Sequence, residues 1–239
     1  MLEVDSIAVN FGAVVAVKDV SLRLRAGAVG ALLGANGAGK SSLLGAISGL
    51  VRTSKGTITF HGSEIQGMKC YKRKGRGIVH GLEGHRVFGD LTVQENLVLG
   101  ALSPGSHKIE RRSLQAALER EYERFPVLGD RRRQKAGLLS GGEQQMLTIS
   151  STLMSDPKLL LLDEPSLGLS PKMATIIFAT IEQLARDGLA ILLVEQTVDR
   201  ALDVADTVWV LRQGLVVREG TPQEIAAAGD IGELYLGTG

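Results

Sequence analysis

Hydrophobic and polar residues alternate along the first two segments of the chain, as they do in half-buried antiparallel strands. Later segments are short and almost wholly apolar, which is typical of strands covered on both faces of a parallel sheet. The alternating segments are Leu2–Val9 and Val14–Leu24, and the apolar runs are Val29–Leu33, Leu159–Leu162, Ala190–Val194 and Val208–Leu211. Two further strand candidates are Thr57–Phe60 and Leu215–Arg218. The pattern predicts an α/β protein with a mainly parallel sheet and an N-terminal antiparallel β subdomain.

Helical patterns separate most of the apolar runs, and this alternation is typical of a sheet with helices on both faces. The predicted helices are Ser41–Leu50, Lys172–Arg186 and Val198–Val204. From Val93 to Leu139 helix formers dominate, especially over Glu110–Arg124, and clear strand signals are absent. We therefore predict a single domain over residues 1–239, with a helical subdomain inserted at roughly residues 89–155.

Composition narrows the classes of function that the chain can have. It has 239 residues, of which 44% are hydrophobic and 22% charged, and a net charge of +1. Because there is no large basic excess to neutralise phosphates, we expect no nucleic-acid partner. The single cysteine, Cys70, excludes an internal disulfide. No apolar run approaches the roughly 18 to 20 residues of a membrane-spanning helix, and the N-terminus does not resemble a signal peptide, so we expect any membrane role to depend on a partner.

A glycine-rich segment follows the apolar run Val29–Leu33 and precedes a predicted helix. Residues 34–41, Gly-Ala-Asn-Gly-Ala-Gly-Lys-Ser, match the phosphate-loop pattern G-x-x-x-x-G-K-[ST] at every fixed position. Such a loop turns backbone N–H groups toward phosphates, and the helix adds its positive end. Lys40 is predicted to reach the β- and γ-phosphates, and Ser41 to bind Mg²⁺. A chance match is the alternative, but the strand–loop–helix context favours a nucleotide site. The predicted nucleotide-binding residues of this segment are Gly34, Ala35, Asn36, Gly37, Ala38, Gly39, Lys40, Ser41 and Ser42.

Two acidic residues, Asp163 and Glu164, directly follow the run Leu159–Leu162. Ligands of parallel sheets bind at the carboxyl ends of the strands, where these residues are expected to lie. Asp163 is predicted to hold Mg²⁺, through a water molecule, and Glu164 to act as the general base toward the water that attacks the γ-phosphate. A buried strand that simply ends in exposed acids is the alternative, and the phosphate loop favours the catalytic interpretation.

Residues 139–145, Leu-Ser-Gly-Gly-Glu-Gln-Gln, form a third motif. Ser140 and Glu143 fit a capping box at the start of a helix, but Gly141 and Gly142 exceed what a cap needs and suit close approach of a phosphate. With this signature segment, the sequence resembles the ABC ATPases over essentially its whole length. The resemblance implies a head-to-tail dimer in which Ser140, Gly141, Gly142 and Glu143 contact the ATP held by the partner's phosphate loop.

Further segments are similar to the ATPases of branched-chain amino-acid importers. They are residues 82–88 (Leu-Glu-Gly-His-Arg-Val-Phe), 91–97 (Leu-Thr-Val-Gln-Glu-Asn-Leu), 164–169 (Glu-Pro-Ser-Leu-Gly-Leu), 194–196 (Val-Glu-Gln) and 235–237 (Tyr-Leu-Gly). These importers carry two different ATPase subunits, and this chain resembles the one with Val-Glu-Gln. The resemblance implies ATP and Mg²⁺ as cofactors, a second ATPase subunit in a heterodimer, transmembrane permease subunits, and an extracytoplasmic solute-binding protein that acts indirectly. It also implies a peripheral position on the cytoplasmic face of the cell membrane.

The resemblance assigns roles to three more residues. Phe11 would stack on adenine, with a place in the core as the alternative; Glu83 would contact the metal; and Gln196 would take the place of the switch histidine at the γ-phosphate. Five positions depart from the family or its subgroup. Glu83 stands where most members of the family have glutamine, Gln196 where they have the switch histidine, and Ser170 where they have aspartate. Leu82 stands where the subgroup usually has proline, and Ser151 where the signature helix normally has arginine. Two alternatives to an importer ATPase therefore stay open: a nucleotide-gated scaffold with weak hydrolysis, and an ABC ATPase that works outside transport.

Two basic clusters complete the set of candidate features. They are Lys72, Arg73 and Lys74 with Arg76, and Arg131, Arg132 and Arg133 with Lys135. We expect both clusters to lie on the solvated surface. The alternative is a basic edge that faces membrane subunits or anionic lipid headgroups, where each charge could contribute about 1 kcal/mol.

Overall fold

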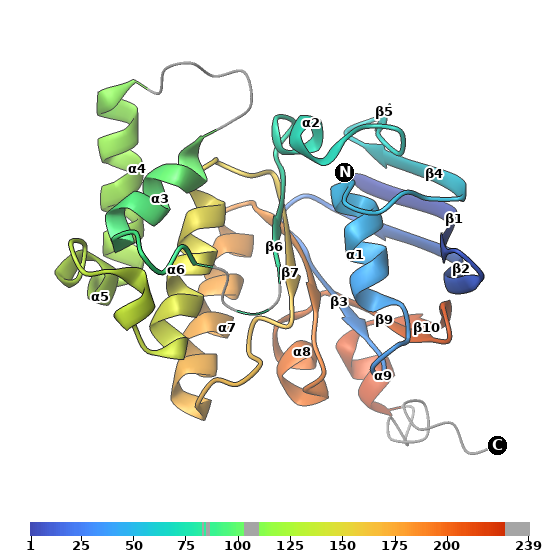
Figure 1. The fold of residues 1–239 in the computed structure, drawn as a ribbon. Helices are drawn as coiled ribbons and strands as arrows, with labels where there is room; N and C mark the ends of the chain where they lie inside the picture. Colours follow the sequence, from blue (N-terminus) through green and yellow to red (C-terminus); the bar gives the residue numbers. More distant parts are fainter. Residues whose placement is uncertain (83, 85–86, 103–109, 228–239) are drawn as a thin grey trace.

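A ten-stranded sheet forms the centre of the computed structural model, which describes residues 1–82, 84, 87–102 and 110–227 (Figure 1). The strand order is β5-β4-β1-β2-β10-β9-β3-β8-β7-β6. The strands are β1 (Leu2–Phe11), β2 (Val14–Leu24), β3 (Val29–Leu33), β4 (Lys55–Phe60), β5 (Ser63–Glu64), β6 (Ile78–Gly81), β7 (Leu159–Asp163), β8 (Ala190–Val194), β9 (Thr207–Arg212) and β10 (Leu215–Gly220).

The sheet has a parallel half and an antiparallel half, as the hydrophobic pattern predicts. β3 pairs in parallel with β8 and β9, and β7 pairs in parallel with β6 and β8. Every residue of β3, β7 and β8 is buried, which explains why these segments are continuous apolar runs. β1 pairs antiparallel with β2 and β4, and its pairing with β2 contains register shifts that bend the ribbon. The predicted fold class is confirmed.

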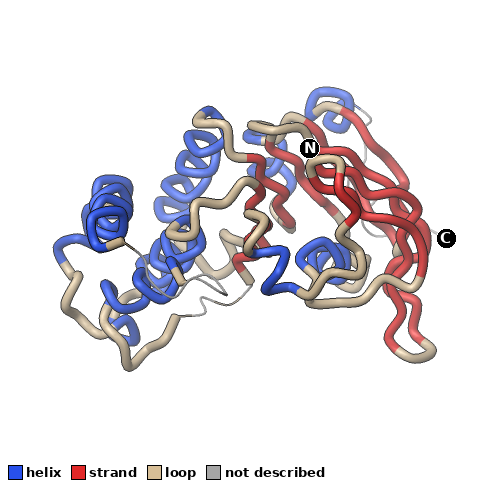
Figure 2. Tube along the Cα trace, turned by 90° about the horizontal axis from the view of Figure 1, so that it is seen from above, coloured by secondary structure: helices blue, strands red, loops and turns tan. Residues whose placement is uncertain are grey.

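The helices gather in two groups. The helices of the described chain are α1 (Lys40–Ser48), α2 (Cys70–Lys74), α3 (Val93–Ala101), α4 (Arg111–Arg124), α5 (Pro126–Asp130), α6 (Gly141–Leu153), α7 (Pro171–Arg186), α8 (Val198–Val204) and α9 (Pro222–Ala227), with a 3₁₀ turn at Ala136–Leu138. Helices α3 to α6 lie together on one side, away from the antiparallel strands (Figures 1 and 2). We call α3 to α6 the helical region; the predicted boundaries of roughly 89–155 remain a prediction.

Two hydrophobic clusters hold these layers together. One lies between the parallel strands and helices α3, α6 and α7, and the other joins α1 to the antiparallel strands. Trp209 of β9 is fully buried in the second cluster, and Gly30 of β3 faces it: a Cβ added at Gly30 would lie 2.7 Å from the Trp209 ring. The glycine is therefore required by the indole, because the interior has no room for both side chains.

Helix α1 begins one residue before the predicted Ser41–Leu50 and ends earlier, at Ser48. Gly49 stops it by adopting a left-handed conformation with φ of 81°, and its N–H bonds back to the carbonyls of Gly45 and Ala46. The hydrophobic pattern of the sequence does not predict β5, β6 or α2. All three are too short to show a clear hydrophobic period.

The expectation of a solvated basic cluster is wrong for Arg73, which is only 1% exposed. Its Nη1 donates to the carbonyls of Ala46 (2.6 Å) and Ile47 (2.8 Å) at the end of α1, and its Nε donates to Met68 (2.9 Å). The carbonyls at a helix C-terminus attract a cation, so the guanidinium is buried as a cap. Burial lowers the pKa of Arg73 to about 10.

His80 of β6 gives the fold a measurable dependence on pH. Its Nδ1 lies 3.1 Å from the Ser48 hydroxyl, its Nε2 is buried without a hydrogen-bond partner, and burial lowers its pKa from 6.5 to about 4. Above pH 6.5 the ring is neutral in both states. Between pH 6.5 and about pH 4 the unfolded chain binds a proton at His80 that the folded chain does not bind. The free energy of unfolding therefore falls as the pH falls through this window.

Replacement of His80 by Gln should remove this loss. Between pH 7 and pH 5 the parent chain should lose up to roughly 2 kcal/mol more unfolding free energy than His80→Gln does. Urea denaturation at both pH values measures the difference, and His61→Gln, at an exposed histidine, is the matched control. An equal pH dependence in all three proteins would contradict this account.

Candidate functional site

The phosphate loop connects the buried strand β3 to helix α1, as predicted. Residues 34–39 form the loop, and Lys40, Ser41 and Ser42 begin the helix. Gly37 and Gly39 have φ values of 81° and 105°, a region that side-chain-bearing residues rarely adopt. They differ in their surroundings: a Cβ at Gly39 would lie 2.4 Å from the Ala16 carbonyl oxygen, whereas one at Gly37 would meet nothing within 4 Å. Gly39 is therefore fixed by close packing against β2.

Lys40 is buried to 5% exposure at the start of α1. Its Nζ crosses the loop and donates to the carbonyls of Gly34 (2.6 Å) and Ala35 (3.1 Å). Burial lowers the pKa of Lys40, and the charges of Glu164 and Asp163 oppose that shift. The ammonium thus sits inside the loop that it would share with a phosphate group.

Asp163 and Ser41 bring an acidic oxygen and a hydroxyl together at the carboxyl edge of the sheet. The Ser41 hydroxyl donates to Asp163 Oδ1 at 3.2 Å, and Asp163, the last residue of β7, is 7% exposed. A hydroxyl and a carboxylate suit Mg²⁺, which takes oxygen ligands and keeps several waters. The described residues contain no group of three or more His, Cys, Asp or Glu that could hold a metal ion by itself. Glu83, the third predicted metal contact, lies outside the described residues.

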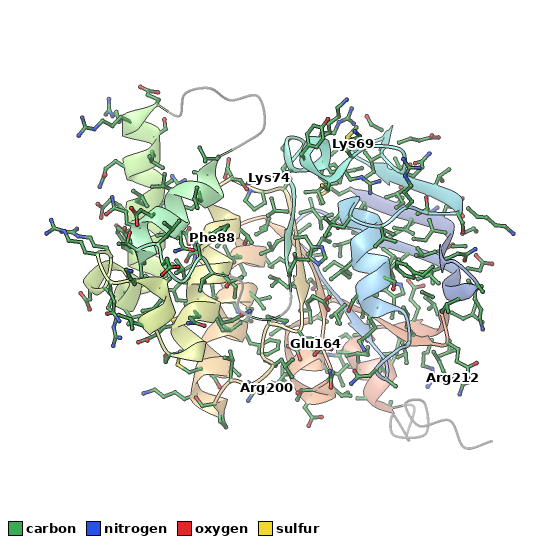
Figure 3. All side chains as sticks on the ribbon, in the orientation of Figure 1. Lys69, Lys74, Phe88, Glu164, Arg200 and Arg212 are labelled. Atoms are coloured by element: carbon green, nitrogen blue, oxygen red, sulfur yellow. The ribbon has the colours of Figure 1, made fainter. Side chains whose placement is uncertain are left out.

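Glu164 is held by Gln196, 32 positions away in the sequence. The Gln196 Nε2 lies 2.7 Å from each Glu164 carboxylate oxygen. This contact arises because β7 and β8 are adjacent parallel strands, so the residues that follow them meet at one edge. Glu164 has a φ of 49°, and such a conformation in a residue with a side chain persists only where its surroundings impose it. Figure 3 shows Glu164 at the same end of the sheet as the start of α1.

Glu195 is a residue of the site that the sequence analysis did not assign. It is 2% exposed, and its two carboxylate oxygens accept from the backbone N–H of Ser166 (3.1 Å) and of Gln196 (3.2 Å). Burial raises its pKa, and the hydrogen bonds oppose that shift. The carboxylate therefore ties the loop after β7 to the segment after β8, and so positions both Glu164 and Gln196. In the sequence, the signal that could have identified Glu195 is an acidic residue between Val194, the end of an apolar run, and Gln196.

The signature segment starts α6 with the expected capping box. Ser140 Oγ accepts from the Glu143 N–H, and Glu143 Oε2 accepts from the Ser140 N–H. Gly142 is buried, and a Cβ there would lie 2.6 Å from Met173, so packing against α7 already requires this glycine. Gly141 is exposed. The signature residues belong to the helical region and not to the cluster formed by Lys40, Ser41, Asp163, Glu164 and Gln196.

Phe11 ends β1 with 51% of its surface exposed, so the alternative of a core aromatic is wrong. An exposed ring at the end of a strand is free to stack on a flat partner, and contact with adenine remains a prediction. Ser170, at the position of the family's aspartate, is exposed and caps α7 by accepting from the Met173 N–H.

Comparison with known proteins agrees with this geometry. The sequence profile of the ABC transporter family matches residues 17–167. BraG of Pseudomonas aeruginosa, a high-affinity branched-chain amino acid transport ATP-binding protein, is 41% identical over 237 residues, which cover 99% of this chain and 100% of BraG. BraF of the same organism, with the same description, is 30% identical over 252 residues, which cover 99% of this chain and 98% of BraF. The ADP conformation of an ABC transporter cassette superposes with a TM-score of 0.88 at 28% identity, covering 100% of this chain and 99% of that one.

The fold and the site define a P-loop ATPase, and the chain belongs to the ABC transporter family. It is an ATP-binding and ATP-hydrolysing subunit of such a transporter. Among the described residues, no helix combines the length and the apolar character needed to cross a membrane.

The two loop glycines offer a direct test of the phosphate loop. Gly39→Ala should weaken ATP binding by at least tenfold, because the new methyl group would collide with the Ala16 carbonyl and displace the loop. Gly37→Ala also has a positive φ but an open environment, so it should weaken binding less. Titration calorimetry with ATP compares the two variants. Equal affinities in Gly39→Ala and Gly37→Ala would show that the contact with Ala16 does not shape the loop.

Proposed function

We propose that this chain powers an ABC importer of branched-chain or related amino acids. The observation that carries the proposal is the similarity to BraG, which extends over the whole of both chains. The contact between Gln196 and Glu164 supports it further, because the Val-Glu-Gln segment that resembles one importer subunit is part of the site.

In the proposed mechanism each residue at the carboxyl edge of the sheet has a separate role. The N–H groups of the phosphate loop and the Lys40 ammonium bind the β- and γ-phosphates, while Phe11 stacks on adenine. Bound Mg²⁺, held by Ser41, Asp163 and Glu83, would neutralise phosphate charge. Glu164 accepts the proton of the attacking water, which is oriented between its carboxylate and the γ-phosphate.

Gln196 keeps Glu164 in place and donates a hydrogen bond to a γ-phosphate oxygen when ATP is bound. An amide does not titrate near neutral pH as an imidazole does, so its contribution is constant across that range. In the alternative, a scaffold with weak hydrolysis, the Glu164 carboxylate would have no catalytic role. The two close contacts that fix the Glu164 carboxylate favour hydrolysis.

The proposed assembly pairs this chain with a second, different ATPase subunit. BraG and BraF of Pseudomonas aeruginosa are both high-affinity branched-chain amino acid transport ATP-binding proteins, and this chain is more similar to BraG. In the dimer the signature residues Ser140, Gly141, Gly142 and Glu143 of each subunit would meet the ATP on the phosphate loop of the other. Because only one subunit carries Gln196, the two ATP sites would not be equivalent.

Transmembrane permease subunits are the other proposed partners, and they would place the chain on the cytoplasmic face of the membrane. A groove of about 470 Å³ lies where the end of α1, β6 and α6 meet. Its rim carries the exposed apolar residues Leu50 and Tyr71, and its wall includes Leu82. A groove with an apolar rim suits a permease segment, and a solute-binding protein would act only through the permease.

Replacement of Glu164 by Gln tests both the chemistry and the assembly. Hydrolysis should slow about 10²- to 10⁴-fold, the usual contribution of a positioned base, while ATP binding persists. ATP should then trap the closed dimer, whose subunits can be identified after isolation from solubilised membranes. Glu219→Gln, the same change at an exposed position of β10, is the control. Undiminished turnover in Glu164→Gln would refute the role of the base, and a trapped homodimer of this chain would refute the heterodimer.

A further inference from the structure

The short helix α2 contacts the C-terminal ends of two other helices. Its Arg73 is buried at the end of α1, where it donates to the carbonyls of Ala46 and Ile47. Its next residue, Lys74, faces the other way, toward α3 (Figure 3). Lys74 Nζ donates to the carbonyls of Leu102 (2.9 Å) and Gly100 (3.2 Å) at the end of α3. Consecutive side chains of α2 thus contact the two helix ends, each through C-terminal carbonyls, which attract a cation.

Helix α3 is in turn fixed to α6 by a very close backbone contact. A Cβ at Gly100 would lie 2.1 Å from the Ser151 carbonyl oxygen, so the two helices meet where neither has a bulky side chain. The Ser151 hydroxyl also donates to the Asn96 carbonyl at 3.4 Å. Ser151, which departs from the arginine usual in the family, therefore lies at a close approach of α3 and α6. A movement of α3 at this point must carry α6 with it.

The two series of contacts lead to the two motifs with which one subunit would contribute to the two ATP sites of the proposed dimer. Helix α1 starts at Lys40 of the phosphate loop, and α6 starts beside Ser140 of the signature segment. Each of these motifs lies at the N-terminus of its helix, and α2 connects to the far end of each helix, through Arg73 to α1 and through Lys74 and α3 to α6. The phosphate loop and the signature segment are therefore linked by rigid elements with α2 between them.

We propose that Lys74 is a positioning residue that sets the orientation of the helical region relative to the phosphate-loop helix α1, and with it the presentation of the signature segment. The role in turnover rests on the proposed function of the signature segment, whereas the orientation itself does not. Lys74 is half-buried, which lowers its pKa, and it also lines the groove assigned above to the permease. An occupant of that groove would lie against the same ammonium and could change its contact with α3.

A distance measured between the antiparallel strands and the helical region tests the orientation of the helical region directly. Spin labels at Lys55→Cys on β4 and Glu123→Cys on α4, two exposed positions, would be placed in a Cys70→Ser background of the full chain. The parent and Lys74→Arg, which keeps a cation on α2, should give one narrow distance distribution. Lys74→Met should give a broader or shifted distribution, and Lys72→Met, which removes an exposed neighbouring charge, should match the parent. Identical distributions in Lys74→Met and Lys72→Met would overturn the proposal.

Steady-state kinetics test the consequence for the reaction. Lys74→Met should lower the kcat of ATP hydrolysis about tenfold, and its affinity for ATP should stay within twofold of the parent, because Lys74 does not touch the phosphate loop. Lys74→Arg should recover most of the turnover. A kcat in Lys74→Met equal to that in Lys72→Met would overturn the role in turnover. A complex of the parent chain with its partner ATPase subunit that hydrolyses no ATP would instead refute the proposed function, and the distance distributions would still decide the orientation.

Loss of folding would be recognised in the same experiments. Lys74→Gln serves as a second variant that retains a hydrogen-bond donor without the charge, and a cooperative melting transition shows that a variant is folded. If Lys74→Met and Lys74→Gln both melt cooperatively, we expect the width of the spin-label distance distribution to increase from Lys74→Arg through Lys74→Gln to Lys74→Met. That order supports positioning by the charged contact. Cooperative melting with unchanged distances in both Gln and Met variants would overturn it.

Discussion

The buried ammonium of Lys40 is the interaction on which the rest of the site depends. A charge so enclosed is costly unless it is paired and hydrogen-bonded. Here two loop carbonyls accept from it, and two carboxylates, Glu164 and Asp163, raise its pKa against the effect of burial. The loop, the end of β7 and the start of α1 must therefore lie close together, because each supplies part of what offsets the cost.

Parallel strands make that convergence possible. β3, β7 and β8 are neighbours that run the same way, so the residues after them reach one edge of the sheet from three distant parts of the sequence. Buried Glu195 then joins the segments after β7 and β8 through backbone N–H groups. The helical region stands apart from this edge, and in the proposed dimer its signature segment would complete the ATP site of a second subunit. In that arrangement one chain would bind ATP, and two chains would form the closed dimer.

Much of the fold and part of the site could be predicted from local sequence. The phosphate loop and the pair Asp163 and Glu164 are contiguous motifs, and the buried strands are apolar runs, so neither needed knowledge of distant contacts. The contact of Gln196 with Glu164 depends on which strands are neighbours, and the pattern of single segments does not contain that order. The burial of Arg73 was not predicted because a run of basic residues normally lies in solvent. Only the tertiary structure shows that the end of α1 offers carbonyls to its guanidinium.

We expect this edge of the sheet to bind the phosphates of ATP through Lys40. Titration calorimetry of the purified chain with ATP and Mg²⁺, compared with Lys40→Ala and with Lys55→Ala at an exposed lysine of β4, measures that binding. We expect saturable binding by the parent and by Lys55→Ala, and an affinity at least 100-fold lower in Lys40→Ala, about 2.7 kcal/mol of lost binding free energy. An affinity for ATP in Lys40→Ala equal to that of the parent would contradict the account.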